Sequence, residues 1–438
     1  MSFESSTTQL TSPREERSAS QATDRRHTFR MALLLATFGF CLLLFLALDW
    51  CATYAVHRRA ASAANQANCR VADPVLHHAL KPNCAFVEHW GHESYNYFTN
   101  SLGFRDERIR QVELTDPRPR ILLLGDSFTE GESAWSDSFA GKLAAGLPQY
   151  DFLNGGGASY SPSVHLNLTR KLLAQGVGFD EAIVFLGTFD VFNEASMYRD
   201  TDGGAGLAGP EHQRWNISRY AKLRFLVARN LMFTNRFVES VERLLVAHGL
   251  YHLATDQWGD EFDLEPVAWT YRPVDETDPH PAGFAPLGAE GGLAKEQAKM
   301  TLLWQELQKH NIPISVVVYP YPSQLVHDSV ESRQVRMWRE WCEGKCKRFV
   351  TVYPEFFAVK DQCPPFQPGC WYLSHFIFGD MHYNATGNAL VAKVVSERLL
   401  QDPPRKIQPP VTAAMQSRLG WPSVAHVGSS EQGRLQPK

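Results

Sequence analysis

Two short motifs, far apart in the sequence, contain the residue types needed to cleave an ester. Ser127 follows Gly125 and Asp126 at the end of an apolar run, and Asp380 stands two residues before His382. A serine hydroxyl becomes a nucleophile when a histidine removes its proton, and the histidine needs an acid that orients its ring. In an extended segment, residues two apart point to the same side. We therefore predict a catalytic triad of Ser127, His382 and Asp380.

Each motif has a simpler interpretation when it is taken alone. A Gly-Asp-Ser sequence is common and could serve only as an N-terminal helix cap. The chain has 16 histidines, most of which we expect on the surface or in the core. The position of His382, after the last expected core strand and before the last expected helix, favours a role in a site.

The sequence from residue 120 to residue 402 alternates between strand and helix patterns. Short, almost fully apolar runs are typical of strands buried in a parallel sheet. Strands that alternate with helices form right-handed β-α-β units and predict an α/β fold, a three-layer α/β/α sandwich. Ligands bind such sheets at the carboxyl ends of the strands, where Ser127 lies. The expected strands are residues 120–126, 150–153, 181–187, 312–319 and 348–353, and the expected helices are residues 136–147, 164–175, 293–310, 330–342 and 386–400.

Between about residues 195 and 290 this alternation breaks down. The stretch is rich in Gly, Pro, Trp and charged residues, and only residues 220–247 have helical spacing. We interpret it as an insertion over the strand ends. It could be a lid or an element that binds an acceptor, or equally a surface excursion without function.

The run from Met31 to Leu48 carries no charge. A helix needs about 20 residues to cross the hydrocarbon core, so we expect a single transmembrane anchor at residues 31–56. Arginines are more frequent before this run than after it, which predicts a cytoplasmic N-terminus and a periplasmic or extracellular domain. The alternative is a cleaved signal peptide, whose apolar core is normally only about 7–15 residues long.

The other segments are assigned from composition. Residues 1–30 and residues 403–438 are polar or lack periodicity, so we expect flexible, disordered tails. Residues 57–119 are a lead-in to the folded domain. The net charge is −4, and no Lys- and Arg-rich face appears in the folded part, so we expect no nucleic-acid partner.

Cysteine usage agrees with export. Apart from Cys41 and Cys51, the cysteines follow the expected anchor. Sequence alone does not fix their pairing. Cys342 and Cys346 could instead bind a metal, but no second ligand pair at zinc spacing accompanies them, and we expect neither a metal nor a cofactor. Proximity along the chain favours the pairs Cys69–Cys84, Cys342–Cys346 and Cys363–Cys370.

Four blocks resemble, in the same order, those of the SGNH/GDSL hydrolase superfamily. Upstream, residues 100–106 (NSLGFRD) resemble the lead-in of many exported members. The resemblance covers about residues 95–402 and implies a flavodoxin-like sheet with Ser127 as the nucleophile. The blocks are residues 125–131 (GDSFTEG), 154–162 (NGGGASYSP), 187–194 (GTFDVFNE) and 380–382 (DMH).

Two departures from the family pattern concern the oxyanion hole. Ser159 stands where many members have a glycine, and Phe189 stands where most have an asparagine. Loss of one oxyanion donor can cost about 10²–10³ in rate. The remaining candidate donors are the backbone N–H groups of Ser127 and Ser159.

Three further residues of these blocks are candidates for the pocket. Gly156 and Asp126 flank the expected oxyanion hole in the second and first blocks. Asp190, in the third block, could serve the site, or it could order a loop or pair with Arg105.

The Asp-x-His spacing of the last block resembles that of membrane-associated alginate O-acetyltransferases. This resemblance implies an anchored, extracytoplasmic esterase that acts on acylated polysaccharide of the envelope or on exported glycans. An O-acetyltransferase served by a polytopic membrane acyltransferase is one alternative. A non-catalytic glycan-binding or scaffold protein is another, and the departure at Phe189 favours it.

Overall fold

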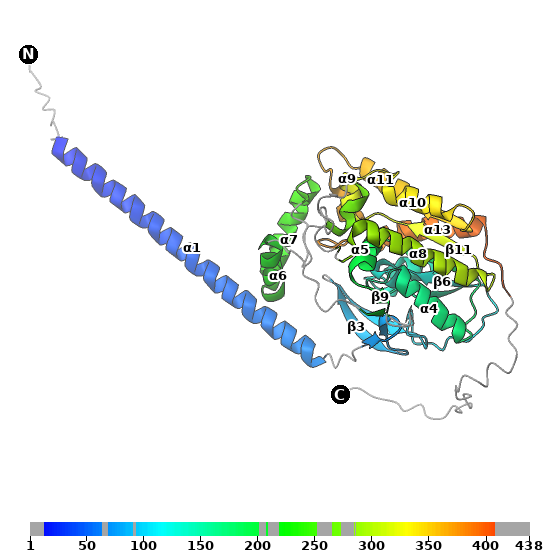
Figure 1. Ribbon diagram of the computed structural model, residues 1–438. Coiled ribbons are helices and arrows are strands. Elements are labelled where there is room, and N and C mark those ends of the chain that lie inside the picture. Colours follow the sequence, from blue (N-terminus) through cyan, green and yellow to red (C-terminus); the bar gives the residue numbers. More distant parts are fainter. Residues whose placement is uncertain are drawn as a thin grey trace, which may run out of the picture. The chain divides into compact units, whose positions relative to one another are not determined.

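The computed structural model describes residues 13–63, 69–90, 93–200, 207–208, 219–251, 265–272, 284 and 286–407. The chain divides into two compact units. We call them the anchor unit (Met1–Asn65 and Lys222–Val241) and the sandwich unit (Gln66–Ala221 and Glu242–Lys438). Figure 1 shows the helices and strands, coloured along the chain.

The anchor unit is built around a long helix, α1 (Pro13–Ala63). Its segment His27–Val56 has a mean hydropathy of 2.6 and is long and apolar enough to cross a membrane, and it contains the expected span, residues 31–56. The helix begins at Pro13, inside the segment expected to be a disordered tail, so residues 13–30 are helical. Residues 1–12 lie outside the described residues.

The sandwich unit contains a central sheet in the strand order β12-β11-β8-β6-β7-β5-β4-β3. The strands from β12 to β7 are parallel, and β6, the first of them in sequence, lies between β7 and β8. This is the flavodoxin-like order, and the expected strands are confirmed. Their bounds are β6 (Arg120–Leu124), β7 (Asp151–Asn154), β8 (Glu181–Leu186), β11 (Ile314–Val318) and β12 (Arg348–Thr351).

Helices cover both faces of this sheet, because alternate strand residues point to opposite sides. Ile121 and Leu123 belong to one core cluster, together with residues of α3 and α13. Leu122 and Leu124 belong to the other, together with residues of α4, α8 and α10. The predicted three-layer α/β/α sandwich is therefore confirmed. The bounds of these helices are α3 (Phe139–Gly146), α4 (Pro162–Ala174), α8 (Gly288–Gln308), α10 (Arg333–Cys342) and α13 (Ala385–Gln401).

The lead-in, for which the sequence predicted no strands, extends the sheet with antiparallel strands. Strands β3 (Ala85–Trp90), β4 (Glu93–Thr99) and β5 (Arg105–Asp106) follow one another, and Arg105 pairs with Asn154 at the edge of β7. Strands β1 (Arg70–Asp73) and β2 (His77–Leu80) form a separate hairpin.

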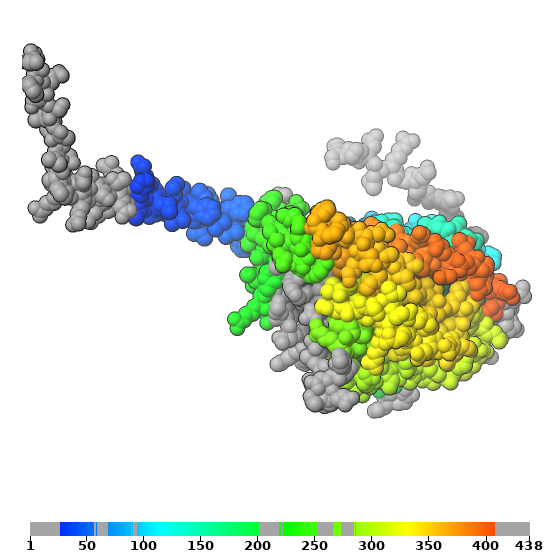
Figure 2. All heavy atoms as spheres, turned by 90° about the horizontal axis from the view of Figure 1, so that it is seen from above, coloured from blue at the N-terminus to red at the C-terminus, as the bar shows by residue number. Residues whose placement is uncertain are grey.

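Shorter elements connect these parts. Figure 2 shows the C-terminal elements, yellow to orange, as one continuous part of the surface. In the expected insertion, the described helices α6 and α7 agree with the helical pattern of residues 220–247, and much of the remainder lies outside the described residues. The shorter elements are α2 (Ser127–Glu130), η1 (Trp135–Asp137), α5 (Phe189–Ser196), β9 (Arg199–Asp200), β10 (Leu207–Ala208), α6 (Arg219–Asn230), α7 (Met232–Ala247), η3 (Glu265–Thr270), α9 (Pro322–His327), α11 (Tyr353–Asp361) and α12 (Cys370–His375).

Within the described part of the chain, the disulfides are Cys69–Cys84, Cys342–Cys346 and Cys363–Cys370, as proximity predicted. Cys342 and Cys346 are therefore bonded to each other. Cys41 and Cys51 are free. Of the expected C-terminal tail, residues 403–407 are described, and Lys406 forms an ion pair with Asp180 at 3.0 Å.

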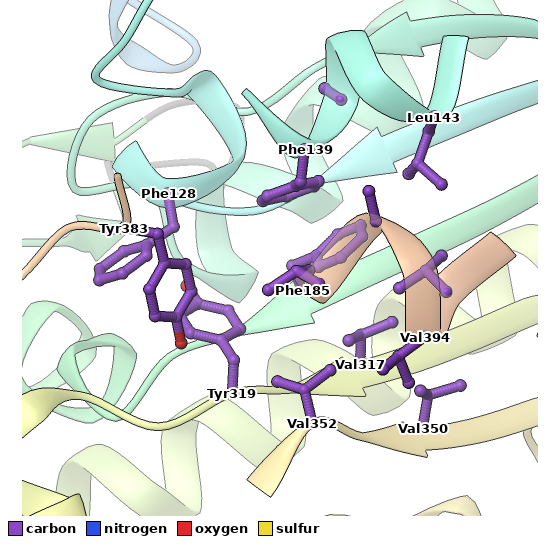
Figure 3. Close-up of a cluster of buried hydrophobic side chains, with 14 of the residues drawn as sticks. Phe128, Phe139, Leu143, Phe185, Val317, Tyr319, Val350, Val352, Tyr383 and Val394 are labelled. Carbon is purple, nitrogen blue, oxygen red and sulfur yellow. The ribbon is translucent and has the colours of Figure 1, made fainter. Parts of the chain in front are cut away.

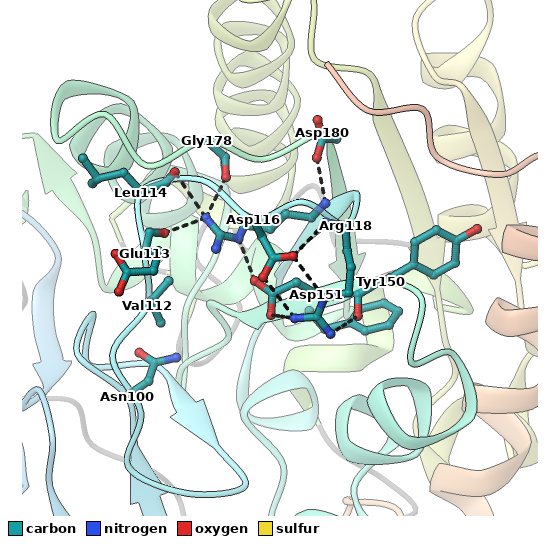
Figure 4. Close-up of polar contacts among 12 residues, drawn as sticks. Asn100, Val112, Glu113, Leu114, Asp116, Arg118, Tyr150, Asp151, Gly178 and Asp180 are labelled. Atoms are coloured by element: carbon teal, nitrogen blue, oxygen red, sulfur yellow. Dashed lines mark hydrogen bonds and ion pairs between the residues drawn. The ribbon is translucent and has the colours of Figure 1, made fainter. Parts of the chain in front are cut away.

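Arginine side chains form a network of polar contacts at the amino ends of the parallel strands. The Arg120 guanidinium is almost fully buried and contacts Asp151 at 2.7 Å. It also donates to backbone carbonyls, among them that of Gly178 at 3.1 Å. Arg118, which is half-exposed, reaches Asp151 at 3.5 Å and Asp116 at 3.0 Å (Figure 4).

Replacing Arg120 with Met should lower the free energy of unfolding by about 3–5 kcal/mol, because it leaves the buried Asp151 carboxylate without its nearest cation. The matched control is Arg118→Met, which removes an exposed cation and should cost about 1 kcal/mol or less. Urea unfolding followed by circular dichroism measures both. Equal losses for the two variants would contradict this account of the network.

Candidate active site

The turn after β6 presents Ser127 at the carboxyl edge of the sheet. Asp126 is the N-cap of the short helix α2, and its side chain accepts a hydrogen bond from the Phe128 N–H at 2.9 Å. Ser127 is the first residue of that helix and is half-buried. Because β6 lies between β7 and β8, Ser127 sits where the strand order reverses, which is the usual ligand site of such sheets.

The structure brings the three predicted triad residues together in a continuous hydrogen-bonded chain. His382 Nε2 lies 2.7 Å from Ser127 Oγ. His382 Nδ1 lies 2.5 Å from Asp380 Oδ1. This is the geometry in which an imidazole can take a proton from a serine while a carboxylate holds its ring.

Aromatic packing brings these distant segments together. Phe128, next to Ser127, packs on Tyr383, next to His382, with ring centroids 5.0 Å apart. The Phe128 ring also lies against the His382 ring at 4.6 Å. Figure 3 shows Phe128, Tyr383 and Tyr319 at one end of the buried cluster that contains Phe139 and Phe185. The triad is thus supported directly by the hydrophobic core.

Asp380 is held by a residue that the sequence did not reveal. The indole N–H of Trp90, at the end of β3, donates to Asp380 Oδ2 at 2.8 Å, leaving Oδ1 for His382. The Trp90 ring also meets the His382 ring edge-on, with centroids 5.5 Å apart. The Tyr372 hydroxyl accepts a hydrogen bond from the Asp380 N–H at 3.2 Å. No motif marks Trp90, so only the fold identifies it.

Asp126 stabilises the turn that carries Ser127. Its buried carboxylate accepts hydrogen bonds from the hydroxyls of Tyr319, at 2.7 Å, and Tyr321, at 3.2 Å. Burial raises the pKa of Asp126 above its ordinary value, although these hydroxyls oppose the shift. In the described structure, the Asp126 carboxylate accepts hydrogen bonds from Phe128, Tyr319 and Tyr321, and it therefore orders the turn.

Asp190 does not pair with Arg105. Its buried carboxyl accepts a hydrogen bond from the Gly187 N–H at 3.1 Å, as the loop-ordering alternative predicts. Burial, and then the nearby charge of Asp126, raise the pKa of Asp190 well above its ordinary range. Arg105 instead donates to backbone carbonyls of the segment that follows Ser127, including that of Glu130 at 2.8 Å.

The backbone N–H groups near Ser127 differ in whether they already have an acceptor within the protein. The Gly156 N–H donates to Asn154 Oδ1 at 3.1 Å, so it is already used. A Cβ at Gly156 would lie 2.6 Å from the Glu130 nitrogen, which explains the need for glycine there. In the described part of the chain, the N–H groups of Ser127 and Ser159 have no protein acceptor. Ser159 has a φ of +60°, which is uncommon for a serine.

Glu130 fixes the loop that carries Ser159. Its carboxylate accepts hydrogen bonds from the Ala158 N–H, at 2.6 Å, and from the Tyr97 hydroxyl, at 2.6 Å. Arg70 lies 2.7 Å from the same carboxylate. Although burial opposes ionisation, Arg70 and these hydrogen bonds lower the pKa of Glu130.

Phe189 contributes no polar donor in place of the family asparagine. Its ring stacks on Tyr321, with centroids 5.8 Å apart. Glu132 is a further acid that acts on His382, and the sequence analysis did not identify it. It is buried, and burial together with the charge of Glu130 raises its pKa to about 8.

His382 is surrounded by acids. Burial alone would lower its pKa, but Asp380, and after it Glu132 and Asp126, raise the pKa of His382 to about 9. A general base has to be unprotonated to accept a proton, so these acids set the pH at which the site can act.

Comparisons with known proteins do not establish the function of this chain. No protein-family model and no curated protein matches the chain. Solved structures that match include a protein from Lactobacillus plantarum, with 10% identity over 66% of this chain and 99% of its own and a TM-score of 0.33. Another is AlinE4, described as an SGNH-hydrolase family esterase, with 14% identity over 66% and 100% and a TM-score of 0.28. A third is the acetyl xylan esterase Est2A from Butyrivibrio proteoclasticus, with 13% identity over 66% and 65% and a TM-score of 0.28.

Replacing Trp90 with Phe should lower kcat of ester cleavage about tenfold, because it removes a hydrogen bond to the charged Asp380, and should leave KM little changed. The matched control is Tyr95→Phe on the neighbouring strand, since in the described structure the Tyr95 hydroxyl has no partner. Steady-state kinetics with a chromogenic ester compare the two. A Tyr95→Phe loss as large as that of Trp90→Phe would argue against a positioning role for the indole.

The pH dependence should report His382. We expect kcat/KM to rise about tenfold per unit below the His382 pKa and to level off above it, with the midpoint near the pKa of about 9. Glu132→Gln removes a negative charge beside the imidazole, so the His382 pKa should fall and the midpoint should move to lower pH. An upward movement, or an unchanged midpoint, would refute this assignment of the electrostatics.

Proposed function

We propose that this protein is an extracytoplasmic, serine-dependent ester hydrolase that removes O-acyl groups from envelope or exported glycans. The observation that carries the proposal is the continuous chain from Asp380 through His382 to Ser127, with distances of 2.5 Å and 2.7 Å. Among the hydroxyls of the described residues, that of Ser127 has both a histidine within hydrogen-bond distance and a carboxylate behind that histidine.

The reaction follows from this geometry. Ser127 Oγ attacks the ester carbonyl carbon while its proton passes to His382 Nε2. The N–H groups of Ser127 and Ser159 are the donors proposed for the tetrahedral oxyanion. As the C–O bond breaks, His382 returns the proton to the departing alcohol, which leaves an acyl group on Ser127. Water then attacks that acyl group while His382 accepts its proton, and His382 returns this proton to Ser127 Oγ as the acyl–oxygen bond breaks and the carboxylic acid is released.

The location is supported by two features of the chain. Helix α1 contains a segment able to cross a membrane, and the cysteines after it form disulfides, which persist in oxidising compartments. Arginines concentrate before that segment, which favours a cytoplasmic N-terminus. An exported, anchored esterase would be in the same compartment as acylated glycans of the envelope.

An O-acetyltransferase is the second candidate, and the membrane helix favours it. A domain tethered beside a polytopic acyl donor could pass the acyl group from Ser127 to a sugar hydroxyl instead of water. The chemistry up to the acyl-enzyme is the same. A non-catalytic binding protein is disfavoured by the assembled triad, for which binding alone gives no reason.

The test is the pre-steady-state release of p-nitrophenol from p-nitrophenyl acetate, with the full chain in detergent. Ser127→Ala should abolish the enzyme-dependent release, a loss of at least about 10³-fold, while leaving the fold intact by circular dichroism. The matched control is Ser163→Ala, a buried serine of α4 outside the triad, which should retain activity.

The time course separates the candidates. Steady turnover supports the hydrolase, whereas a burst of one equivalent that then stalls supports a transferase that lacks its acceptor. If wild type and Ser127→Ala release p-nitrophenol equally, Ser127 is not a nucleophile and the proposal fails.

A further inference from the structure

Within the anchor unit, helix α7 exposes apolar side chains on one side and buries polar side chains on the other. Phe233, Phe237 and Val241 recur every four residues, so they lie on one side of the helix, and all are exposed, Phe237 by 70%. The opposite side carries Asn235 and Glu239, which are only 6% and 7% exposed. A helix that faces water buries its apolar side and exposes its polar side. This arrangement instead suits an apolar surrounding.

The neighbouring helix α6 combines exposed apolar side chains with positive charge. Leu223, Phe225 and Leu226 are exposed, Leu223 by 60%. The helix sequence, RYAKLRFLVARN, contains cations and no acidic residue. Arg224 reaches across to α7 and donates to Asn235 at 2.6 Å. We call residues Lys222–Val241 the basic hairpin.

The basic hairpin is fastened to α1 through Asp49. The Asp49 carboxylate is 2% exposed and accepts hydrogen bonds from the N–H groups of Phe233, at 3.0 Å, and Thr234, at 2.8 Å. The Thr234 hydroxyl donates to the same carboxylate at 2.7 Å. Asp49 therefore caps the N-terminus of α7 from another helix, and the positive end of the helix dipole stabilises its charge.

A second contact repeats this attachment one turn further along α1. The Met232 N–H donates to Thr53 Oγ1 at 2.8 Å. Thr53 is also buried, although its helix is otherwise largely exposed. The only strongly buried polar residues of the His27–Val56 segment among the described residues are thus the ones that hold the basic hairpin.

These contacts fix the depth of the basic hairpin. Asp49 precedes Val56, the end of the membrane-spanning segment, by about 10 Å of helix. The first residues of α7 must then lie near the boundary between acyl chains and headgroups. We propose that the basic hairpin lies in the lipid interface beside α1, with its exposed apolar side chains among the acyl chains and its cations among anionic headgroups.

The occupant of the exposed face is therefore lipid, not a protein. Any group bonded to Asp49 shares its depth, and there the surrounding medium is the bilayer on every side that the protein does not cover. The charge also matches, because α6 carries the exposed Lys222 and Arg229 and no acidic residue. This part of the expected insertion is then neither a lid nor an idle surface excursion.

The experiment uses the full chain with Cys41→Ser and Cys51→Ser, so that one introduced cysteine can carry an environment-sensitive NBD fluorophore. Phe237→Cys places the probe on the exposed face of α7, and Lys309→Cys, at the exposed residue that follows α8, is the control. The protein is reconstituted in nanodiscs of phosphatidylcholine and phosphatidylglycerol with brominated acyl chains, which quench the probe on contact. We expect about a twofold loss of emission at position 237 and none at position 309.

Asp49 provides the second pair of variants. Asp49→Leu removes the cap and should abolish most of the quenching at position 237, whereas Asp49→Asn, also a good capping residue, should retain it. Circular dichroism shows that each variant is folded. Since the bromine is carried only by the acyl chains, quenching reports contact with lipid. A folded protein without quenching at position 237 would overturn the proposal and leave a protein partner for that face, and quenching that survives Asp49→Leu would overturn the role of Asp49.

Discussion

The geometry of the candidate site depends on Asp380, because each of its two carboxylate oxygens is bonded to a different side chain. Asp380 gives Oδ1 to His382 and Oδ2 to Trp90. A carboxylate with only one fixed oxygen can rotate, and the imidazole it holds then loses its direction toward Ser127. The antiparallel strands that carry Trp90 are therefore part of the site, because they turn a flexible acid into a rigid support. The parallel part of the sheet and its helices alone would supply the serine and the histidine but not this restraint.

Buried acids around the triad differ in charge because they differ in partners. Glu130 has Arg70, a tyrosine hydroxyl and a backbone N–H, and these lower its pKa. Glu132, two residues further along, has no such set, and its pKa rises to about 8. Asp190 is buried with a single backbone donor, and its pKa is raised well above the ordinary range. Burial therefore favours the neutral form of Glu132 and Asp190, whereas the partners of Glu130 favour its charged form, in which it holds the loop that carries Ser159.

The sequence could predict what local patterns determine. The parallel strands were found because each is a short apolar run, and Ser127 and His382 because they stand in motifs beside those runs. Strand β4 has only a weak period-two signal, with Tyr95 and Tyr97 buried on either side of the exposed Asn96, and such a pattern does not identify a partner strand. The contact between Trp90 and Asp380 joins residues 290 positions apart, so no local pattern contains it. The hydrogen bond from the Gly156 N–H to the Asn154 side chain was likewise not predictable, because the sequence motif does not show which way that side chain turns.

The long separation within the triad has a consequence for synthesis. Ser127 and His382 are 255 positions apart, so a ribosome completes the serine long before it reaches the histidine. Until then the hydroxyl is as inert as that of any other serine. A nascent chain, or a fragment cut before residue 382, carries no reactive nucleophile. The hydrogen-bonded chain of Asp380, His382 and Ser127 can therefore assemble only after residue 382 has been synthesised.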